Sequence, residues 1–167
     1  MTTYCTPSDM AVVATGGWEE LAQRAAQDGR VTGELLRGLY EGSALSGQSA
    51  EVRRKAQEAL DLLVALCDKT SRFADTFIAV RYRTPLATET VAAADLTSVV
   101  ATIAVLRLHG VAATEDVRAA SKWAFDYLNA VQSGRASLGR QQVQGNDPVT
   151  LATFSGRAVT DIDLNGY

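Results

Sequence analysis

The chain has 167 residues, with 16 basic and 19 acidic side chains and a formal net charge of −3. This length predicts one domain large enough to bury a core, and the acidic balance argues against a protein that coats nucleic acid. Alanine, the strongest helix former, occurs 27 times, whereas proline occurs only 3 times. The composition therefore predicts a soluble, mostly α-helical protein.

The sequence holds a single histidine, His109, and two cysteines, Cys5 and Cys67, that form no C-x-x-C pair. This inventory does not support a histidine-rich metal site or a histidine-dependent triad, so we expect no metal, no cofactor and no enzymatic activity. The N-terminus lacks the pattern of a signal peptide, and no apolar run reaches the ~18 residues of a membrane span. We expect synthesis in a reducing cytoplasm, no membrane contact and a buried free thiol at Cys67.

Helix signals occur three times near the N-terminus. Thr6 is placed to cap a first short helix that has Pro7 in its first turn. A second helix is expected over residues 18–27, with Gly29 placed to end it. Thr32 is then placed to cap a short leucine-containing segment.

A long helix is expected over residues 49–82. Its apolar residues recur every three or four positions, which places them on one helical face. A helix of this length would span about 50 Å, so the sequence leaves open a break at residues 68–71 or a projecting end. Pro85 is expected to end it, because the residue before a proline avoids the helical conformation.

Two further helices are expected in the second half. Asp95 is placed to cap a helix that is apolar on all sides and closes at His109, which is typical of a central helix. Thr114 caps the last helix, with two acidic residues in its first turn, and Gly134 ends it.

The composition changes after Gly139. Residues 141–167 carry one basic and three acidic side chains and show no helical periodicity. We therefore expect a helical bundle over residues 1–140 and an extended C-terminal arm over 141–167. The arm is expected to form short β strands or a hairpin and to need a partner surface.

Candidate functional residues are few. His109 could act as a catalytic base only if the fold brought a carboxylate or a nucleophile close to it, and no motif points to one, so we do not expect it to be catalytic. Arg72, Arg81 and Arg83 lie among aromatic residues, a pattern that can stack on nucleic acid. They can equally pair with Asp68 and Asp75 at helical spacing, and we favour a polar face within or between subunits.

The residues also resemble a known family. Tyr4 to Met10, Arg81-Tyr82 and the closing Gly134-Arg135 to Gly139 are similar to motifs of the phage Mu-type neck protein family of Mu-like phages and prophages. The end of the chain, from Phe154 to Tyr167, resembles the tail of the same family. Members of this family are head–tail connector, or adaptor, proteins of the virion.

The resemblance implies a ring of about twelve subunits at the virion neck, with head-to-tail contacts between adjacent copies. Its partners would be the portal protein above, a stopper or tail terminator protein below, and double-stranded DNA that passes through without specific binding. Host cytoplasm would be the site of assembly. The alternative interpretation is a small helical DNA-binding or regulatory prophage protein.

The resemblance also suggests which residues make these contacts. Arg72, Arg81 and Arg83 are candidates for an intersubunit or lumen face. Candidates for docking on the portal or on a neighbour all lie in the arm: Phe154, Arg157, Ile162, Leu164 and Tyr167.

Overall fold

The computed structural model describes residues 3–43 and 47–139. Within these ranges the chain forms seven α-helices and one short 3-10 helix, with no strand, which confirms the mostly α-helical prediction. The α-helices are α1 (Pro7–Val13), α2 (Gly17–Ala26), α3 (Gly33–Tyr40), α4 (Ala50–Ile78), α5 (Thr88–Ala93), α6 (Leu96–His109) and α7 (Glu115–Ser133). The 3-10 helix, η1, spans Gly110–Ala112. The arm expected at residues 141–167, with its predicted strands, lies outside the described residues.

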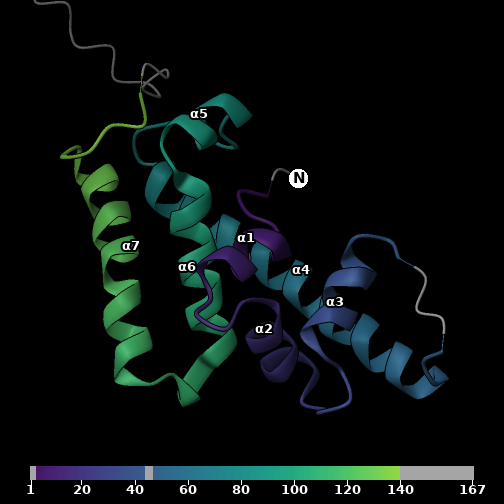
Figure 1. Cartoon of the computed structure of the whole chain (residues 1–167). Coiled ribbons are helices and arrows are strands. Elements are labelled where there is room, and N and C mark those ends of the chain that lie inside the picture. The colour runs from purple at the N-terminus through teal and green to yellow at the C-terminus, as the bar shows by residue number, and fades with distance from the viewer. Residues whose placement is uncertain (1–2, 44–46, 140–167) are drawn as a thin grey trace, which may run out of the picture.

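Helix α6 is the centre of the molecule. It packs against α1, α2, α4, α5 and α7, and eight of its residues are buried. Figure 1 shows α6 between α7 on one side and α1 and α2 on the other. The prediction from its all-round apolar sequence is therefore confirmed.

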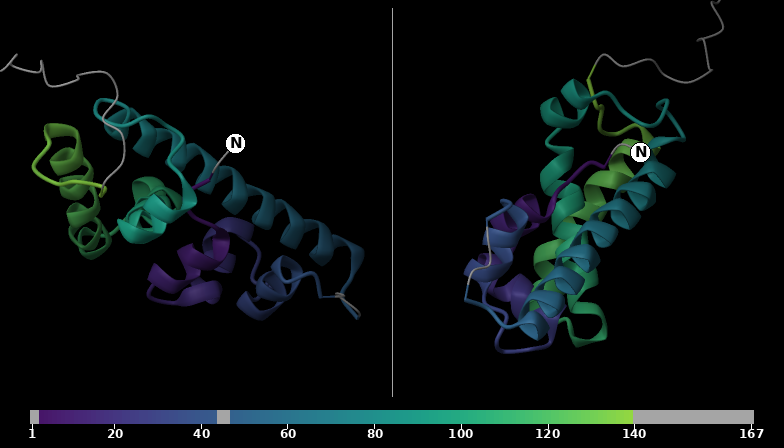
Figure 2. Two further views of the ribbon diagram at one scale, coloured as in Figure 1. Left: turned by 90° about the horizontal axis from the view of Figure 1, so that it is seen from above. Right: turned by 90° about the vertical axis from the view of Figure 1, so that its right-hand side faces the viewer.

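Helix α4 is continuous over 29 residues, or about 44 Å. Figure 2 shows it running unbroken along the molecule. The break suggested near residues 68–71 does not occur. Ser71 donates its hydroxyl to the carbonyl of Cys67, one turn earlier, at 2.8 Å, so this polar residue is satisfied without opening the helix.

The end of α4 differs from the prediction. The helix ends at Ile78 rather than near residue 82, well before Pro85. The reason is tertiary, because the chain turns so that Tyr82 is 4 % exposed and enters the core. Its hydroxyl accepts a hydrogen bond from the backbone N–H of Leu138 at 3.1 Å. A helix α5 that the sequence analysis did not predict follows this turn.

Most helix boundaries follow the predicted caps. The side chains of Thr6, Thr32 and Thr114 each accept a hydrogen bond from a backbone N–H three residues later. Gly134 ends α7 with φ of 77°, a left-handed conformation that favours glycine. Arg81 lies against it, since a Cβ at Gly134 would come within 2.4 Å of the guanidinium.

Two predicted boundaries were wrong in detail. Helix α2 ends at Ala26, and its C-cap Gln27 takes the left-handed conformation with φ of 51°, before Gly29 is reached. Asp95 precedes α6 with φ of 48°, and its carboxylate accepts the hydroxyl of Ser98 at 2.7 Å instead of a backbone N–H. Both residues accept a conformation that sequence rules assign to glycine.

Tyr4 fastens the N-terminal segment to the bundle. Its backbone N–H donates to Ser71 Oγ at 2.9 Å, and its hydroxyl donates to Asp75 Oδ1 at 2.5 Å. The same hydroxyl accepts the backbone N–H of Leu86 at 3.1 Å. Burial, together with the adjacent Asp75 carboxylate, raises the pKa of Tyr4, so the hydroxyl stays protonated and able to donate.

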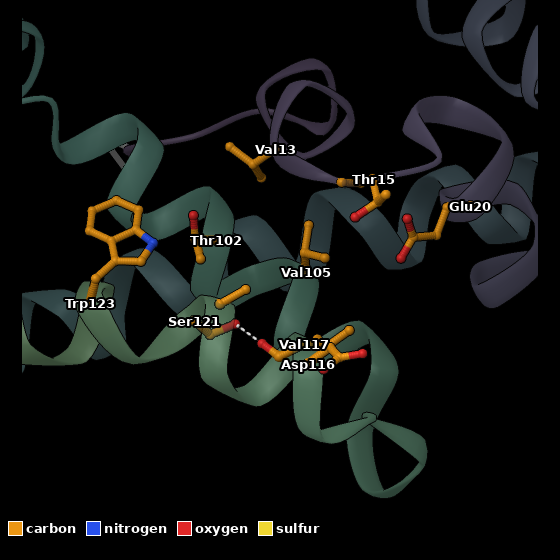
Figure 3. Close-up of a pocket in the computed structure, with 11 residues that line it drawn as sticks. Val13, Thr15, Glu20, Thr102, Val105, Asp116, Val117, Ser121 and Trp123 are labelled. Atoms are coloured by element: carbon orange, nitrogen blue, oxygen red, sulfur yellow. Dashed lines mark hydrogen bonds between the residues drawn. The ribbon is translucent and has the colours of Figure 1, made fainter.

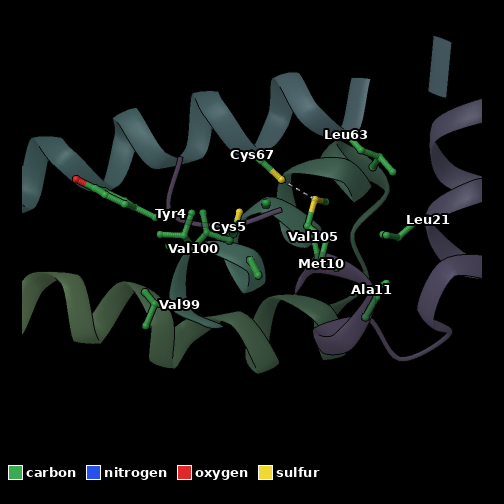
Figure 4. Close-up of a cluster of buried hydrophobic side chains, with 14 of the residues drawn as sticks. Tyr4, Cys5, Met10, Ala11, Leu21, Leu63, Cys67, Val99, Val100 and Val105 are labelled. Carbon is green, nitrogen blue, oxygen red and sulfur yellow. Dashed lines mark hydrogen bonds between the residues drawn. The ribbon is translucent and has the colours of Figure 1, made fainter. Parts of the chain in front are cut away.

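The sulfur-containing residues lie in the core beside this segment. Cys5 and Cys67 are both buried free thiols, as predicted for Cys67. Cys67 Sγ lies 3.4 Å from Met10 Sδ, as Figure 4 shows. This contact packs α1 onto α4.

Candidate functional site

A groove lies over α6, between the end of α1 and the first half of α7 (Figure 3). Its volume is about 510 Å³. It exists because α1 and α7 both pack against α6 but do not contact each other. Thr102 and Val105 of α6 line it between Val13 on the α1 side and Val117 on the α7 side (Figure 3).

The two ends of the groove differ in chemistry. At one end the indole of Trp123 is half exposed, with 47 % of its surface open to solvent. At the other end lie the carboxylates of Glu20 and Asp116 (Figure 3). None of the described residues that line the groove is basic. The site therefore joins an apolar, aromatic end to an acidic end.

Glu20 is held in place by two partners. One carboxylate oxygen accepts the backbone N–H of Gly16 at 2.8 Å, and the other lies 2.6 Å from His109 Nε2. Burial acts to raise the pKa of Glu20, but these two hydrogen bonds outweigh it, and its pKa falls below the ordinary value. The second acid, Asp116, is exposed at the start of α7 and has no hydrogen bond or ion pair to a described residue.

His109 is a buried structural residue in this arrangement. Its side chain is 4 % exposed, and its bond to Glu20 ties the end of α6 to α2. Its Nδ1 has no hydrogen-bond partner among the described residues. The fold thus brings His109 a carboxylate partner, Glu20, that no sequence motif indicated.

The three arginines proposed for a shared face do not line the groove. Arg72 is exposed on α4 and pairs with Asp68, as the helical spacing predicted. Arg81 is half-buried against Gly134, and its Nε has no partner among the described residues. Arg83 is exposed in the turn after α4.

The aromatic rings near these arginines pack against one another. Phe73 packs edge-on against Phe77, with ring centres 5.1 Å apart, and against Phe125 at 6.3 Å. Arg107 covers the face of Phe73 at 4.2 Å from the ring centre. These contacts stabilise the junction of α4, α6 and α7 and use ring surfaces that a nucleic-acid base would need.

The basic cluster at the start of α4 is a solvated helical face. Arg54 pairs with Glu58 at 2.5 Å and Lys55 approaches the same carboxylate at 3.6 Å. Such exposed pairs on one helix contribute little to stability.

Three further observations concern the metal sites, membrane spans and docking residues predicted or excluded from the sequence. No group of three or more histidine, cysteine or acidic side chains in the described part of the chain is placed to hold a metal ion. None of its helices is long and apolar enough to cross a lipid bilayer. The predicted docking residues of the arm lie outside it: Phe154, Arg157, Ile162, Leu164 and Tyr167.

Sequence reasoning missed the groove. One signal could have pointed to it, since Trp123 lies off the apolar stripe of α7 that includes Ala124 and Leu128. A tryptophan outside the buried face of a helix is a candidate contact residue. The acidic end could not be found in this way, because Glu20 and Asp116 are far apart in sequence.

Comparison with known proteins identifies the family. A family model described as Bacteriophage Mu, Gp36 matches residues 4–153, which covers every described helix. A search of curated proteins found no match. Because the family model spans most of the chain, from Tyr4 through α7 and beyond, this protein belongs to the Bacteriophage Mu Gp36 family.

Proposed function

We propose that this chain is a structural head–tail connector subunit of a tailed phage. About twelve copies would form a closed ring beneath the portal, join the capsid to the tail and let genomic DNA pass through the lumen. The ring would contact the portal on one side and a stopper or tail terminator on the other. The proposal gives the protein a role in assembly and no enzymatic one.

Membership of the phage Mu Gp36 family is the observation that carries this proposal. Family membership indicates a phage protein, and the resemblance of the sequence to neck proteins favours the connector among the possible roles in the phage. The proposed location is the neck of the virion, with DNA as a passing contact rather than a bound ligand.

The fold supplies surfaces suited to a ring. Helix α4 is about 44 Å long and exposes Leu62 and Val64, which are 46 % and 49 % open to solvent. Exposed apolar side chains on a long helix favour contact with another subunit. The net charge of −3 per chain also suits a conduit, because like charge keeps DNA from adhering to the wall.

The arm is proposed to make the contact with the portal or a neighbouring copy. Its candidate contact residues remain Phe154, Arg157, Ile162, Leu164 and Tyr167. Arg72, Arg81 and Arg83 remain candidates for the face toward a neighbour or the lumen. Ordering such a segment on a partner would add contact area that the helical domain does not supply.

Removal of residues 141–167 tests the assignment of the arm. We expect the shortened protein to keep its helical circular dichroism and to lose its binding to the portal. Phage particles made with it should have filled heads without joined tails. Infectious particles completed with the shortened protein would contradict the role of the arm.

Duplex binding distinguishes the connector from a DNA-binding regulator. A regulator should bind DNA with an affinity that falls steeply as salt rises, because phosphate contacts release counterions. We expect no measurable duplex binding by the isolated chain at physiological ionic strength. Tight, salt-dependent binding there would contradict the connector proposal.

A further inference from the structure

We propose that the groove over α6 is the docking site for residues 154–157 of the same chain. Phe154 would lie against Trp123 at the apolar end of the groove. Arg157 would pair with Asp116 at the acidic end. The contact concerns the isolated subunit and does not depend on the connector role.

The groove defines what can fill it. Its volume of about 510 Å³ falls in the range of sites that hold a peptide side chain or a small ligand. The half-exposed indole of Trp123 favours an aromatic or apolar group. Asp116 favours a cation, because it is exposed and has no partner among the described residues. Glu20 adds negative charge although both of its oxygens are already bonded.

The segment beyond Gly139 offers one stretch with this chemistry. Residues 140–167 contain two basic side chains, Arg140 and Arg157, and only Arg157 has an aromatic residue nearby. Phe154 precedes Arg157 by three positions, which separates them by about 10 Å in an extended chain. Near the end of the chain, Asp161 and Asp163 would be repelled by the acidic end of the groove.

The chain is long enough to make this contact within one molecule. Phe154 lies fifteen positions after Gly139, and an extended chain spanning that many positions reaches about 50 Å. The whole of α7 measures about 28 Å, and the groove lies along its first half. Tethering also raises the effective concentration of the segment to about millimolar, which favours the chain's own groove over that of another copy.

In an isolated subunit, the contact would bury part of the arm in the groove. Phe154 and Arg157 would remain in the groove until a partner surface competes for them. Premature association between free subunits would then be reduced, because an exposed aromatic and its charged neighbour are hidden. This consequence rests on the proposed connector role, whereas the contact itself does not.

The two tryptophan indole N–H signals of the full-length protein provide the test. Trp18, in α2, packs against Tyr40 of α3 and does not line the groove, so it serves as an internal control. We expect Phe154→Ala and Arg157→Glu each to shift the Trp123 signal in the nitrogen–proton spectrum and to leave the Trp18 signal in place. Leu164→Ala and Arg140→Glu are the matched controls and should shift neither. A Trp123 signal that is identical in all five proteins would overturn the proposal.

A charge swap tests the pairing at the acidic end. Asp116→Arg alone should shift the Trp123 signal as Arg157→Glu does, and the two changes combined should restore the original position. A synthetic peptide of residues 150–160 added to the Phe154→Ala protein should restore it too, with about fivefold weaker binding once Asp116 is changed to Asn. Failure of both the double variant and the peptide to restore the signal would refute the pairing.

Protein concentration separates the chain's own segment from that of another copy. We expect the signal to be unchanged over an approximately tenfold dilution, with a monomeric mass by light scattering. A signal that changes on dilution together with a dimeric mass would overturn docking within one chain. Particle assembly plays no part in these measurements, so their failure is distinguishable from failure of the connector proposal.

Discussion

Two regions of the molecule differ in whether their polar and aromatic groups are bonded within the fold or exposed to solvent. At the tyrosine end, defined by Tyr4 and Tyr82, each hydroxyl accepts a backbone N–H from a distant segment, that of Leu86 or Leu138. In the groove over α6, Trp123 is half exposed and Asp116 lacks a partner among the described residues. The first region uses its groups inside the fold, and the second leaves them for another contact.

This difference separates stability from recognition. The tyrosine end joins three segments that are far apart in sequence, and loss of one hydroxyl leaves a buried N–H without a partner. The exposed side chains of the groove, those of Trp123 and Asp116, should contribute less to stability, because they contact solvent. Changes in the closed region should therefore lower stability strongly, whereas changes to the exposed groove residues Trp123 and Asp116 should affect binding more than stability.

The largest expected effect comes from two neighbours on α6. Ile103 is fully buried, so Ile103→Ala should lower the free energy of unfolding by about 2–5 kcal/mol through the cavity it leaves. Thr102 lines the groove, so Thr102→Ala should cost less than about 1 kcal/mol. Urea unfolding of the two variants measures both. Equal costs would show that this part of the groove is as closed as the core.

The next effect concerns the tyrosine end. Tyr4→Phe removes a hydroxyl that serves Asp75 and the N–H of Leu86, and we expect a cost of about 1–3 kcal/mol. Tyr40→Phe is the matched control, because Tyr40 is exposed at 38 % and should change stability by less than about 0.5 kcal/mol. Thermal unfolding of both variants gives the comparison. A neutral Tyr4→Phe would mean that the hydroxyl is dispensable.

A smaller effect depends on pH at the acidic end of the groove. The pKa of Glu20 is lowered in the folded protein, so its ionised form stabilises the fold above its ordinary pKa of 4.5. This contribution is lost as pH falls through the lower, folded value. Other acids titrate in the same range, so the informative quantity is the difference between wild type and Glu20→Gln. That difference should shrink on acidification, and a constant or growing difference would contradict the role given to Glu20.

The smallest effect on stability is expected on the open face of α7. Trp123→Ala should lower the free energy of unfolding by no more than about 1 kcal/mol, because much of the indole is already in solvent. Leu128→Ala on the same helix is the contrast, with an expected cost of about 2–5 kcal/mol for a fully buried leucine. Chemical unfolding monitored by circular dichroism compares them. A comparable loss in both would place Trp123 in the core.

Local signals predicted much of this fold. The apolar stripe of α4, the all-round apolar sequence of α6 and the threonine caps report directly on what each segment buries or bonds. The turn after Ile78 could not be read in this way, because it is set by burial of Tyr82 against a segment more than fifty residues away. The left-handed Asp95 is a further case, since its carboxylate bonds the hydroxyl of Ser98 and not a backbone N–H, a difference that the capping pattern does not reveal.

The candidate site was less accessible to sequence reasoning than the helices. The groove arises from two helices that both pack on α6 and leave a gap, which no local pattern encodes. The arginines were found from their spacing, but that spacing reports helical pairing such as Arg72 with Asp68 rather than a shared surface. The family resemblance predicted a protein of Mu-like phages, and the family match over residues 4–153 supports that origin.

Electron microscopy of the virion neck tests the central claim most directly. The protein should be found as a closed ring of about twelve copies between the portal and the tail, with its helices packed side by side. Specific labelling of the chain in intact particles would confirm the assignment of that density. A location elsewhere in the particle, or the absence of the chain from mature virions, would contradict the connector role.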